Sequence, residues 1–361
     1  MTDEAQFMRR AIELAERGRH RVMPNPLVGC VLVRDGKIIA EGWHDHLGGL
    51  HAEQMAIADA EAKGVATQGS TAYVTLEPCN HFGRTPPCTE ALLWAGVKRV
   101  VIGADDPNPT VRGEGTTALV DSDIEVESGL LAEECNTQMR EFMHWCENMR
   151  PEVLLKAAID ANGRVDCDPN ESAQRFSSPE SLEIVHALRA DSMAILVGVD
   201  TVVRDDPSLT VRGPGIGPRN SPIRVVVDPS DRIPKDCKLM NDGKAPTLLI
   251  HANPSESANS DKQHVERAVF SASNGEIPIA RILDYLGDRG IQSLLVEGGP
   301  NTWRRFLAEG LVDRAHICQS PVKLSGSGNV FSDNELSSAG LSKFREIEVG
   351  GDKISHWRRE D

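Results

Sequence analysis

The sequence predicts an α/β protein built from two domains. Its 361 residues exceed the usual size of one domain, which spans roughly 100 to 200 residues. Short apolar, β-branched runs alternate with helical stretches in both halves, as expected for sheets covered by helices. The proline of Arg150-Pro151 interrupts this alternation. We therefore predict one domain over residues 1–148 and a second over residues 151–361.

The first half begins with a helical pattern over 3–17 that Gly18 ends, since glycine is common directly after a helix. Apolar runs over 27–33 and 37–43 predict a hairpin, because Asp35-Gly36 between them favours a tight turn. The elements expected next are a helix at 51–63, a strand at 71–76, a helix at 89–95, a strand at 97–103 and a helical stretch at 131–148.

The second half continues the same alternation. We expect strands over 153–159, 193–199, 223–228, 247–251 and 293–297, and helices over 178–190, 279–289 and 301–309. Gly, Pro, Ser and Asn are concentrated at 213–222 and 254–274, which predicts surface loops there.

Composition and charge argue against several classes of protein. The net charge is −15, and residues 1–150 carry −9 of it without a basic stripe, whereas nucleic-acid binding needs Lys and Arg at the phosphates. The longest apolar runs, such as 193–199, are far shorter than the ~20 residues of a membrane-spanning helix. The acidic N-terminus and only eight cysteines predict a reduced, cytoplasmic protein rather than a secreted one.

Three short segments together predict a catalytic zinc site. His51 and Glu53 lie at the start of a helix, Cys79 follows a strand, and Cys88 begins the next helix, whose dipole favours the thiolate. One imidazole and two thiolates suit Zn²⁺, and three protein ligands leave a fourth position for a water that zinc activates. Glu53 is placed to take that water's proton and pass it to a departing amine.

Other interpretations stay open on these residues alone. His-x-Glu is common by chance, and two cysteines separated by eight residues are often buried thiols. The three ligands would also suit a structural zinc clip in a binding protein. The order His-x-Glu, Pro-Cys, Cys matches zinc nucleobase deaminases, although that motif has two residues between its cysteines.

The longer spacing resembles that of one particular family. Residues 78–88, Pro-Cys-Asn-His-Phe-Gly-Arg-Thr-Pro-Pro-Cys, are similar to the zinc loop of the riboflavin-biosynthesis deaminases, the N-terminal half of the bifunctional RibD family. The segments 24–29, 42–44 with 51–53, and 106–109 resemble the same family in the same order.

The resemblance implies a cytidine-deaminase-like, three-layer first domain. One zinc ion per chain would bind His51, Cys79 and Cys88, and Glu53 would be the catalytic proton shuttle. The substrate contacts that it implies are Asn25, His44, His81, Asp106 and Asn108. The serine that usually follows the first cysteine of the family is Asn80 here.

The second half contains no Gly-x-Gly-x-x-Gly after a strand, so a Rossmann dinucleotide site is not predicted. The segment 296–302 instead runs from a strand through Gly298-Gly299 into a helix. Backbone amides at such a helix start can hold a phosphate, and glycine lets the ligand come close.

Five segments of this half, at 186–190, 197–202, 205–212, 223–228 and 296–302, resemble the reductase half of the RibD family. This implies a dihydrofolate-reductase-like α/β domain that uses NADPH. The implied substrate contacts are Ser172, Arg189, Leu209, Arg212 and Glu297, and the implied NADPH contacts are Ala158, Arg175, Thr201, Asp205, Gly299, Pro300, Asn301 and Thr302. Arginine suits the substrate's phosphate because its fork binds oxyanions bidentately. The segments 161–163 and 171–177 depart from the family pattern.

The resemblance therefore implies a bifunctional enzyme of riboflavin biosynthesis. As a hydrolase it would deaminate 2,5-diamino-6-ribosylamino-4(3H)-pyrimidinone 5′-phosphate with zinc, and as an oxidoreductase it would reduce the ribosyl group to ribityl with NADPH. We expect a homo-oligomer, a dimer or a tetramer, with neither a nucleic-acid nor a membrane partner. The alternatives are an active deaminase fused to an inactive reductase, a polynucleotide deaminase, and a structural zinc-binding module.

Overall fold

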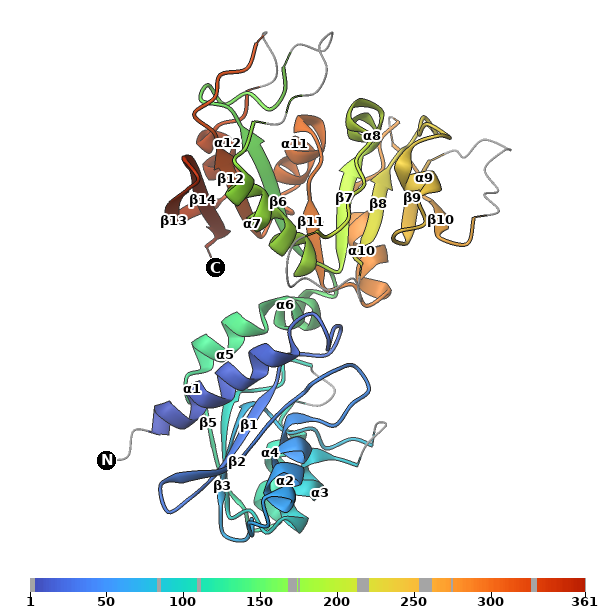
Figure 1. Ribbon diagram of the computed structural model, residues 1–361. Coiled ribbons are helices and arrows are strands. Elements are labelled where there is room, and N and C mark those ends of the chain that lie inside the picture. The colour runs from blue at the N-terminus through green and yellow to red at the C-terminus, as the bar shows by residue number, and fades with distance from the viewer. Residues whose placement is uncertain are drawn as a thin grey trace. The chain divides into compact units, whose positions relative to one another are not determined.

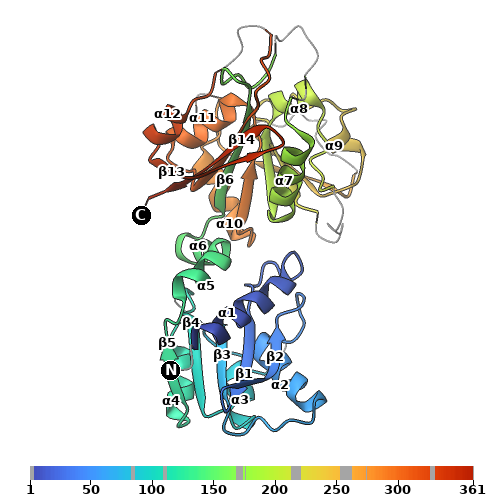
Figure 2. The same cartoon turned by 60° about the vertical axis from the view of Figure 1, so that its left-hand side comes forward.

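The computed structural model describes residues 4–82, 86–108, 112–167, 174, 176–212, 221–252, 262–273, 275–325 and 330–360. The chain divides into two compact units, Met1–Met149 and Arg150–Asp361 (Figures 1 and 2). Each unit has its own sheet with helices packed on it, which confirms the predicted α/β class. No described helix is both long and apolar enough to span a membrane.

The first unit contains a five-stranded sheet with the order β2-β1-β3-β4-β5. The β1 strand pairs antiparallel with β2 and β3, and the β3, β4 and β5 strands run parallel to one another. The strands are β1 (Gly29–Arg34), β2 (Lys37–Trp43), β3 (Thr71–Leu76), β4 (Arg99–Ala104) and β5 (Glu125–Ser128).

The turn between β1 and β2 confirms the predicted hairpin. Asp35 and Gly36 have φ angles of 52° and 71°. Two consecutive left-handed residues form a type I′ turn, whose twist matches that of the flanking strands. Glycine adopts this conformation without steric cost, and aspartate is one of the few other residues that tolerate it.

Helices cover both faces of this sheet and produce three layers (Figure 1). One face carries α1 (Glu4–Ala15), followed by a 3-10 turn at Glu16–Gly18, together with α5 (Ala132–Gln138) and α6 (Arg140–Asn148). The other face carries α2 (Ala52–Ala62), α3 (Cys88–Trp94) and α4 (Glu114–Asp121). The zinc-loop cysteines lie at the β3 end and the α3 start, on this second face.

One predicted element of the first unit needs correction. The stretch 131–148 forms two helices, because Met139 leaves the helical path with φ −111°. Its side chain is buried in the core beneath α1, and the neighbouring Gln138 donates hydrogen bonds to the Ile12 carbonyl and to Glu16. Packing against α1 therefore overrides the continuous helical pattern.

The second unit contains a nine-stranded sheet with the order β10-β9-β8-β7-β11-β6-β12-β14-β13. All neighbours from β10 to β12 run parallel, and β14 and β13 are added antiparallel at one edge. The strands are β6 (Glu152–Ile159), β7 (Ala194–Gly198), β8 (Ile223–Val227), β9 (Thr247–His251), β10 (Val265–Val269), β11 (Ser293–Val296), β12 (Arg314–Gln319), β13 (Leu341–Val349) and β14 (Asp352–Arg359).

Two apolar clusters hold helices on opposite faces of this sheet (Figure 2). The larger cluster joins the sheet to α10 (Ile279–Asp288), α11 (Pro300–Ala308) and α12 (Asp333–Ser338). The smaller cluster joins it to α7 (Pro179–Ala190), α8 (Val199–Asp205) and α9 (Lys238–Asn241).

The surface loop expected at 254–274 is only partly correct. Residues 265–269 form β10, which pairs with β9 alone and carries Glu266 and Arg267 within its five residues. This short, charged edge strand lacks the apolar run of a central strand. Residues 213–220 of the other expected loop, and 253–261 and 274 of this one, lie outside the described residues.

Candidate active sites

His51, Cys79 and Cys88 converge in the first unit, although 37 residues separate the first from the last. Their ligand atoms all lie within 4.8 Å of one another. The Nδ1 atom of His51 is 3.2 Å from the Cys88 Sγ and 3.5 Å from the Cys79 Sγ. One nitrogen and two sulfurs at this spacing fit a zinc ion, and within the described ranges this cluster contains no fourth ligand.

Both ends of the zinc loop are tied to neighbouring helices. The Gln54 side chain of α2 donates to the Pro86 carbonyl at 2.9 Å. The Thr89 hydroxyl of α3 donates to Asn80 Oδ1 at 2.7 Å. His51 itself is the N-cap residue of α2, so the ligand position is set where that helix starts.

The two thiols differ in how readily they ionise. A hydrogen bond from Cys88, and after it one from His51, lower the pKa of Cys79 to about 4 although burial opposes this. Donating that hydrogen bond, together with burial, holds the pKa of Cys88 above its usual value. The helix start was expected to favour the Cys88 thiolate, and the burial of this thiol opposes that effect.

Glu53 lies at the second residue of α2 and is only 3% exposed. Burial, and secondly the charge of Cys79, raise its pKa to about 7. A carboxyl in this position exchanges a proton near neutral pH, as a general acid and base must.

Asn25 and His44 are joined by a hydrogen bond of 3.1 Å between Asn25 Nδ2 and His44 Nε2. The His44 Nδ1 atom lies 2.9 Å from the Leu50 carbonyl, which only accepts, so Nδ1 carries the proton. Burial lowers the pKa of His44 and keeps the ring neutral. Nε2 therefore accepts from the Asn25 amide, and the Asn25 carbonyl oxygen points away from His44.

Glu77 joins the zinc loop to the loop that carries Asp106 and Asn108. Its buried carboxylate accepts backbone N–H groups from Asp106 at 3.3 Å, Gly113 at 3.1 Å and Thr116 at 2.9 Å. The sequence analysis missed this residue, and its only signal was the position directly before Pro78-Cys79.

Asp106 accepts the Asn108 backbone N–H at 2.9 Å. Burial raises the pKa of Asp106, and the nearby charge of His81 opposes this increase. The second-loop residues predicted to contact substrate therefore lie within electrostatic reach of the zinc loop.

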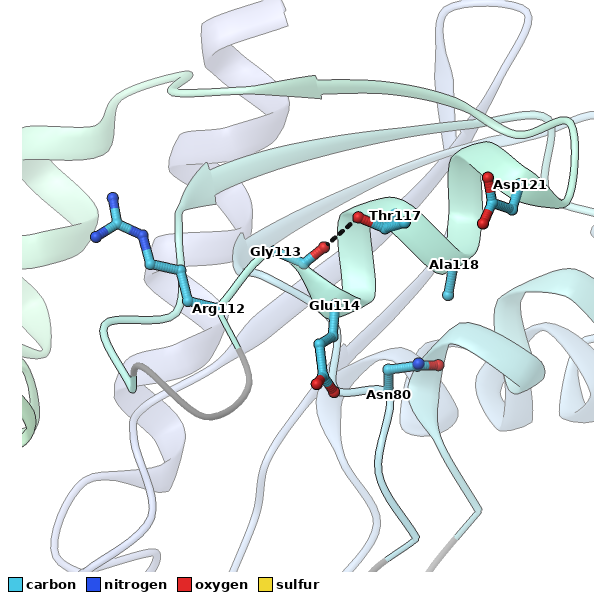
Figure 3. Close-up of a pocket in the computed structure, with 7 residues that line it drawn as sticks. All are labelled: Asn80, Arg112, Gly113, Glu114, Thr117, Ala118 and Asp121. Atoms are coloured by element: carbon cyan, nitrogen blue, oxygen red, sulfur yellow. Dashed lines mark hydrogen bonds between the residues drawn. The ribbon is translucent and has the colours of Figure 1, made fainter.

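A hollow of about 470 Å³ lies beside α4 (Figure 3). It is lined by Asn80, Arg112, Gly113, Glu114, Thr117, Ala118 and Asp121. Figure 3 shows the guanidinium of Arg112 pointing away from Glu114 and Asn80. The lining includes neither a zinc ligand nor a predicted substrate contact, so this hollow is not the candidate active site.

The second unit brings two predicted NADPH segments together at the carboxyl ends of β7 and β11. The Gly299 N–H donates to Thr201 Oγ1 at 3.2 Å. A Cβ at Gly198 or at Gly298 would lie within 2.7 Å of Thr302 atoms, so only glycine allows both turns to approach this side chain. Pro300, Asn301 and Thr302 form the first turn of α11.

Arg189 and Glu297 form a bidentate ion pair of 2.6 and 2.7 Å. Burial opposes ionisation, but Arg189 holds the pKa of Glu297 below its usual value. Lys156 on β6 interacts electrostatically with both, and burial lowers its pKa. The sequence analysis missed Lys156, although a lone lysine within the apolar strand 152–159 is a signal of a functional or paired charge.

The loop that follows α8 carries Leu209 and Arg212. Leu209 is buried and has a φ of 46°, which is unusual for a branched residue. Arg212 is exposed, and its backbone N–H donates to His186 at 3.2 Å. Asp205 ends α8, and Ala158 lies near the end of β6. Ser172 and Arg175 lie outside the described residues.

A second group of possible metal ligands contains Asp228, Asp231 and His251. Arg267 Nη1 lies 2.7 Å from His251 Nε2 and 3.1 Å from Asp231 Oδ1. Asp228 accepts the backbone N–H groups of the following turn. Because the Arg267 guanidinium already occupies Asp231 and His251, and backbone N–H groups occupy Asp228, we describe this group as an ion-pair network rather than a metal site.

Comparisons with known proteins cover both units. The cytidine and deoxycytidylate deaminase zinc-binding region matches residues 1–104, and the RibD C-terminal domain matches residues 151–355. Riboflavin biosynthesis protein RibD of Aquifex aeolicus is 38% identical over 361 residues, which cover 99% of this chain and 98% of that protein. The chain belongs to the RibD family. RibD of Escherichia coli is 37% identical over 372 residues, with 99% of each chain covered.

Solved structures of the RibD family have the same fold. Acinetobacter baumannii RibD, form 2, has a TM-score of 0.86 at 34% identity and covers 98% of each chain. A diaminohydroxyphosphoribosylaminopyrimidine deaminase/5-amino-6-(5-phosphoribosylamino)uracil reductase from Thermotoga maritima has a TM-score of 0.87 at 35% identity, again over 98% of each chain. The RibD architecture, deaminase region first and reductase region second, thus extends over the whole chain.

Proposed function

We propose that this chain is a bifunctional enzyme of riboflavin biosynthesis. Residues 1–148 deaminate 2,5-diamino-6-ribosylamino-4(3H)-pyrimidinone 5′-phosphate, and residues 151–361 reduce the ribosyl group of the product to ribityl. The observation that carries the proposal is the convergence of His51, Cys79 and Cys88 beside the buried Glu53, in a chain of the RibD family.

In the deaminase half, His51, Cys79 and Cys88 hold one zinc ion, which supplies an activated water for hydrolysis when bound. Glu53 takes a proton from the attacking water and delivers protons to the departing amine, so that ammonia leaves. Its buried carboxyl is kept apart from bulk water and reaches the reacting atoms from the start of α2.

The substrate of this half is held by side chains from two sides of the zinc loop. Asn25 presents the amide oxygen that its bond to His44 leaves available. His81, Asp106 and Asn108 contact the pyrimidine and the ribose phosphate. Glu77 keeps their loop against the zinc loop through its three backbone hydrogen bonds.

In the reductase half, NADPH supplies the hydride to C1′ of the ribosyl group when bound. The turn at Gly299, Pro300, Asn301 and Thr302, with Ala158, Arg175, Thr201 and Asp205, binds this cofactor. Ring opening also needs a proton on the sugar oxygen, and we assign its donation to Lys156, which interacts electrostatically with Glu297 and Arg189. Ser172, Leu209 and Arg212 complete the substrate contacts.

The decisive experiment assays each half-reaction on the purified chain after zinc analysis. We expect about one zinc per chain, ammonia release from the diaminopyrimidine phosphate, and NADPH oxidation when the deaminated intermediate is supplied. Ammonia release without any NADPH oxidation would instead support a deaminase fused to an inactive reductase.

The same preparation tests the remaining alternatives. Salt-sensitive RNA binding with RNA deamination would support a polynucleotide deaminase, which the charge of −9 over residues 1–150 disfavours. Zinc retention without any deamination would support a structural zinc module.

We also propose a cytoplasmic homo-oligomer, a dimer or a tetramer. All eight cysteines are free, and seven of them are buried, which suits a reducing compartment. Light scattering on the purified chain gives the mass of the assembly, and a monomeric mass at working concentration would contradict this part of the proposal.

A further inference from the structure

Three cationic side chains hold alternate carbonyls of the loop 206–210 in the second unit. Lys238 Nζ donates to the Asp206 carbonyl at 2.8 Å. Arg224 Nη1 donates to the Ser208 carbonyl at 3.3 Å, and Arg189 Nη1 donates to the Thr210 carbonyl at 3.2 Å. We call these three side chains the carbonyl brace.

Arg224 is the central member of the brace and is fully buried on β8. Besides Ser208, its guanidinium donates to Thr247 Oγ1 at 3.1 Å, Asp242 Oδ1 at 2.8 Å, the Leu239 carbonyl at 3.2 Å and the Ala245 carbonyl at 2.8 Å. These five acceptors match the five N–H donors of arginine. A buried charge is tolerated only when it is paired and hydrogen-bonded, so the position of the guanidinium is fixed on every side.

Because the carbonyl brace holds each carbonyl oxygen, it also determines the direction of the N–H group in the same peptide. In a planar trans peptide the N–H points away from the carbonyl, and the peptides of this loop are trans. The N–H groups of Leu209 and Val211 therefore face away from Arg224 and Arg189. Pro207 has no N–H, so the peptide held by Lys238 presents no donor.

These two N–H groups lack acceptors among the described residues. Leu209 is only 2% exposed and adopts a left-handed φ of 46°, so its donor is both buried and held in a costly conformation. Buried backbone donors in folded proteins are nearly always paired. A bound ligand that supplies the acceptor would explain both the unpaired N–H groups and the left-handed conformation of Leu209.

We propose that Arg224 is a positioning residue of the reductase, which aims the Leu209 and Val211 amides at the phosphate of the substrate. Lys238 supports the same loop from the solvent side, and the exposed Arg212 adds a positive charge at its end. The inference rests on the proposed reductase function for the substrate, but the donor pair itself would bind any compact oxyanion.

Two variants test the brace, and a third is their control. Arg224→Lys keeps the charge but loses the five-donor fork. Lys238→Met removes an exposed side chain whose polar contact with this loop, among the described residues, is with Asp206. Lys235→Met, an exposed lysine in the same connection between β8 and α9, is the matched control. NADPH affinity and thermal melting report whether each variant is folded.

The readouts are the reductase kinetics and the affinity for inorganic phosphate measured by calorimetry. We expect Arg224→Lys to raise the KM for the deaminated substrate and the Kd for phosphate about tenfold, the effect of one lost charge-assisted hydrogen bond. Lys238→Met should raise both about threefold. The kcat, the NADPH affinity and the deaminase rate should stay within about twofold, as in Lys235→Met.

Phosphate affinity separates failure of this inference from failure of the proposed function. If the unmodified chain oxidises no NADPH, the proposed reductase function fails, and phosphate binding alone still tests the brace. An unchanged phosphate Kd in Lys238→Met and in a folded Arg224→Lys overturns the inference. If Arg224→Lys does not fold, Lys238→Met decides. A fall in kcat at unchanged KM would also overturn it, because the residue would then act on the chemical step.

Discussion

Several buried ionic side chains of this chain form hydrogen bonds with partners that fix the orientation of the charged group. Arg224 uses all five donors, and Glu297 is held by both sides of the Arg189 fork. Glu53 is the contrasting case, since no arginine or lysine of the described residues is paired with it and burial raises its pKa to about 7. At the scale of single residues, charged groups with a full set of hydrogen-bond partners hold the surrounding loops in position. The carboxyl group of Glu53, which has fewer partners, is the one available for proton transfer.

Replacing Glu53 by glutamine should separate metal binding from catalysis. Glu53→Gln keeps the size of the side chain and leaves the three zinc ligands in place, but it cannot carry a proton. We expect about one zinc per chain and a deamination rate lower by a factor of about 10³, the usual contribution of a general acid and base. Metal analysis and ammonia release measure the two quantities. Glu61→Gln, exposed on the same helix, is the control, and ammonia release at the parental rate in Glu53→Gln would refute its assigned role.

His316 should make the second unit less stable in acid. Burial, and then the positive charges of His356 and Lys156, lower the pKa of His316 to about 3. The unfolded chain takes up this proton below about pH 6.5, whereas the folded chain does not until about pH 3. Stability contributed by the neutral ring is therefore lost as the pH falls through this window, by up to ~1.4 kcal/mol per pH unit.

Urea unfolding at several pH values measures this effect. Between pH 7 and pH 4.5, His316→Gln should lose about 2 kcal/mol less of its unfolding free energy than the unmodified chain does. Parallel curves for His316→Gln and the unmodified chain would contradict the assignment.

At the scale of elements, the described residues between β4 and the first turn of α4 are held by one side chain, that of Glu77. In the unmodified chain, three backbone N–H groups donate to the two oxygens of the Glu77 carboxylate. Glu77→Gln leaves only one acceptor oxygen for these three donors. We expect the KM for the diaminopyrimidine substrate to rise about tenfold with zinc retained, because Asp106 and Asn108 lose their fixed position. Steady-state deamination at several substrate concentrations measures it. Glu114→Gln, exposed at the start of α4, is the control, and loss of zinc from Glu77→Gln would indicate a role in the zinc loop itself.

Elements with strong local signals could be predicted from the sequence, whereas those formed by long-range pairing could not. The β2 and β3 strands have the predicted bounds, and the Asp35-Gly36 turn has the predicted geometry. The β13–β14 hairpin was missed because β13 is mostly exposed and mixes charged with apolar residues. Its existence depends on pairing with β12, which sequence periodicity does not reveal.

At the scale of the whole molecule, each unit has its own sheet and core, so the two activities should respond separately to metal removal. Dialysis against a zinc chelator should abolish ammonia release while leaving NADPH oxidation on the deaminated intermediate within about twofold. Restoring zinc should return the first activity. Loss of both activities on chelation would show that the reductase unit depends on the metal, contrary to this prediction.

Candidate site residues could be selected from the sequence where a residue type carries the chemistry: His51, Cys79 and Cys88 lie together as expected, and Glu53 interacts electrostatically with Cys79. Residues that act through other residues left no comparable signal. Glu77 accepts hydrogen bonds from residues 29 to 39 positions away. Arg224 donates to Ser208, which precedes β8 in the sequence, and to Ala245, which follows it. Such roles depend on which elements meet in the fold, so only the structure reveals them.

The tied ends of the zinc loop have a consequence for how this enzyme can be modified. Gln54 holds the loop at Pro86, and Thr89 holds it at Asn80, so the anchors lie just inside the two metal-binding cysteines. We therefore expect substitutions at His81 and Phe82, which lie between the anchors, to leave the metal ligands in place. Substrate choice could then be varied at these positions, by natural divergence or in a library, without loss of metal affinity.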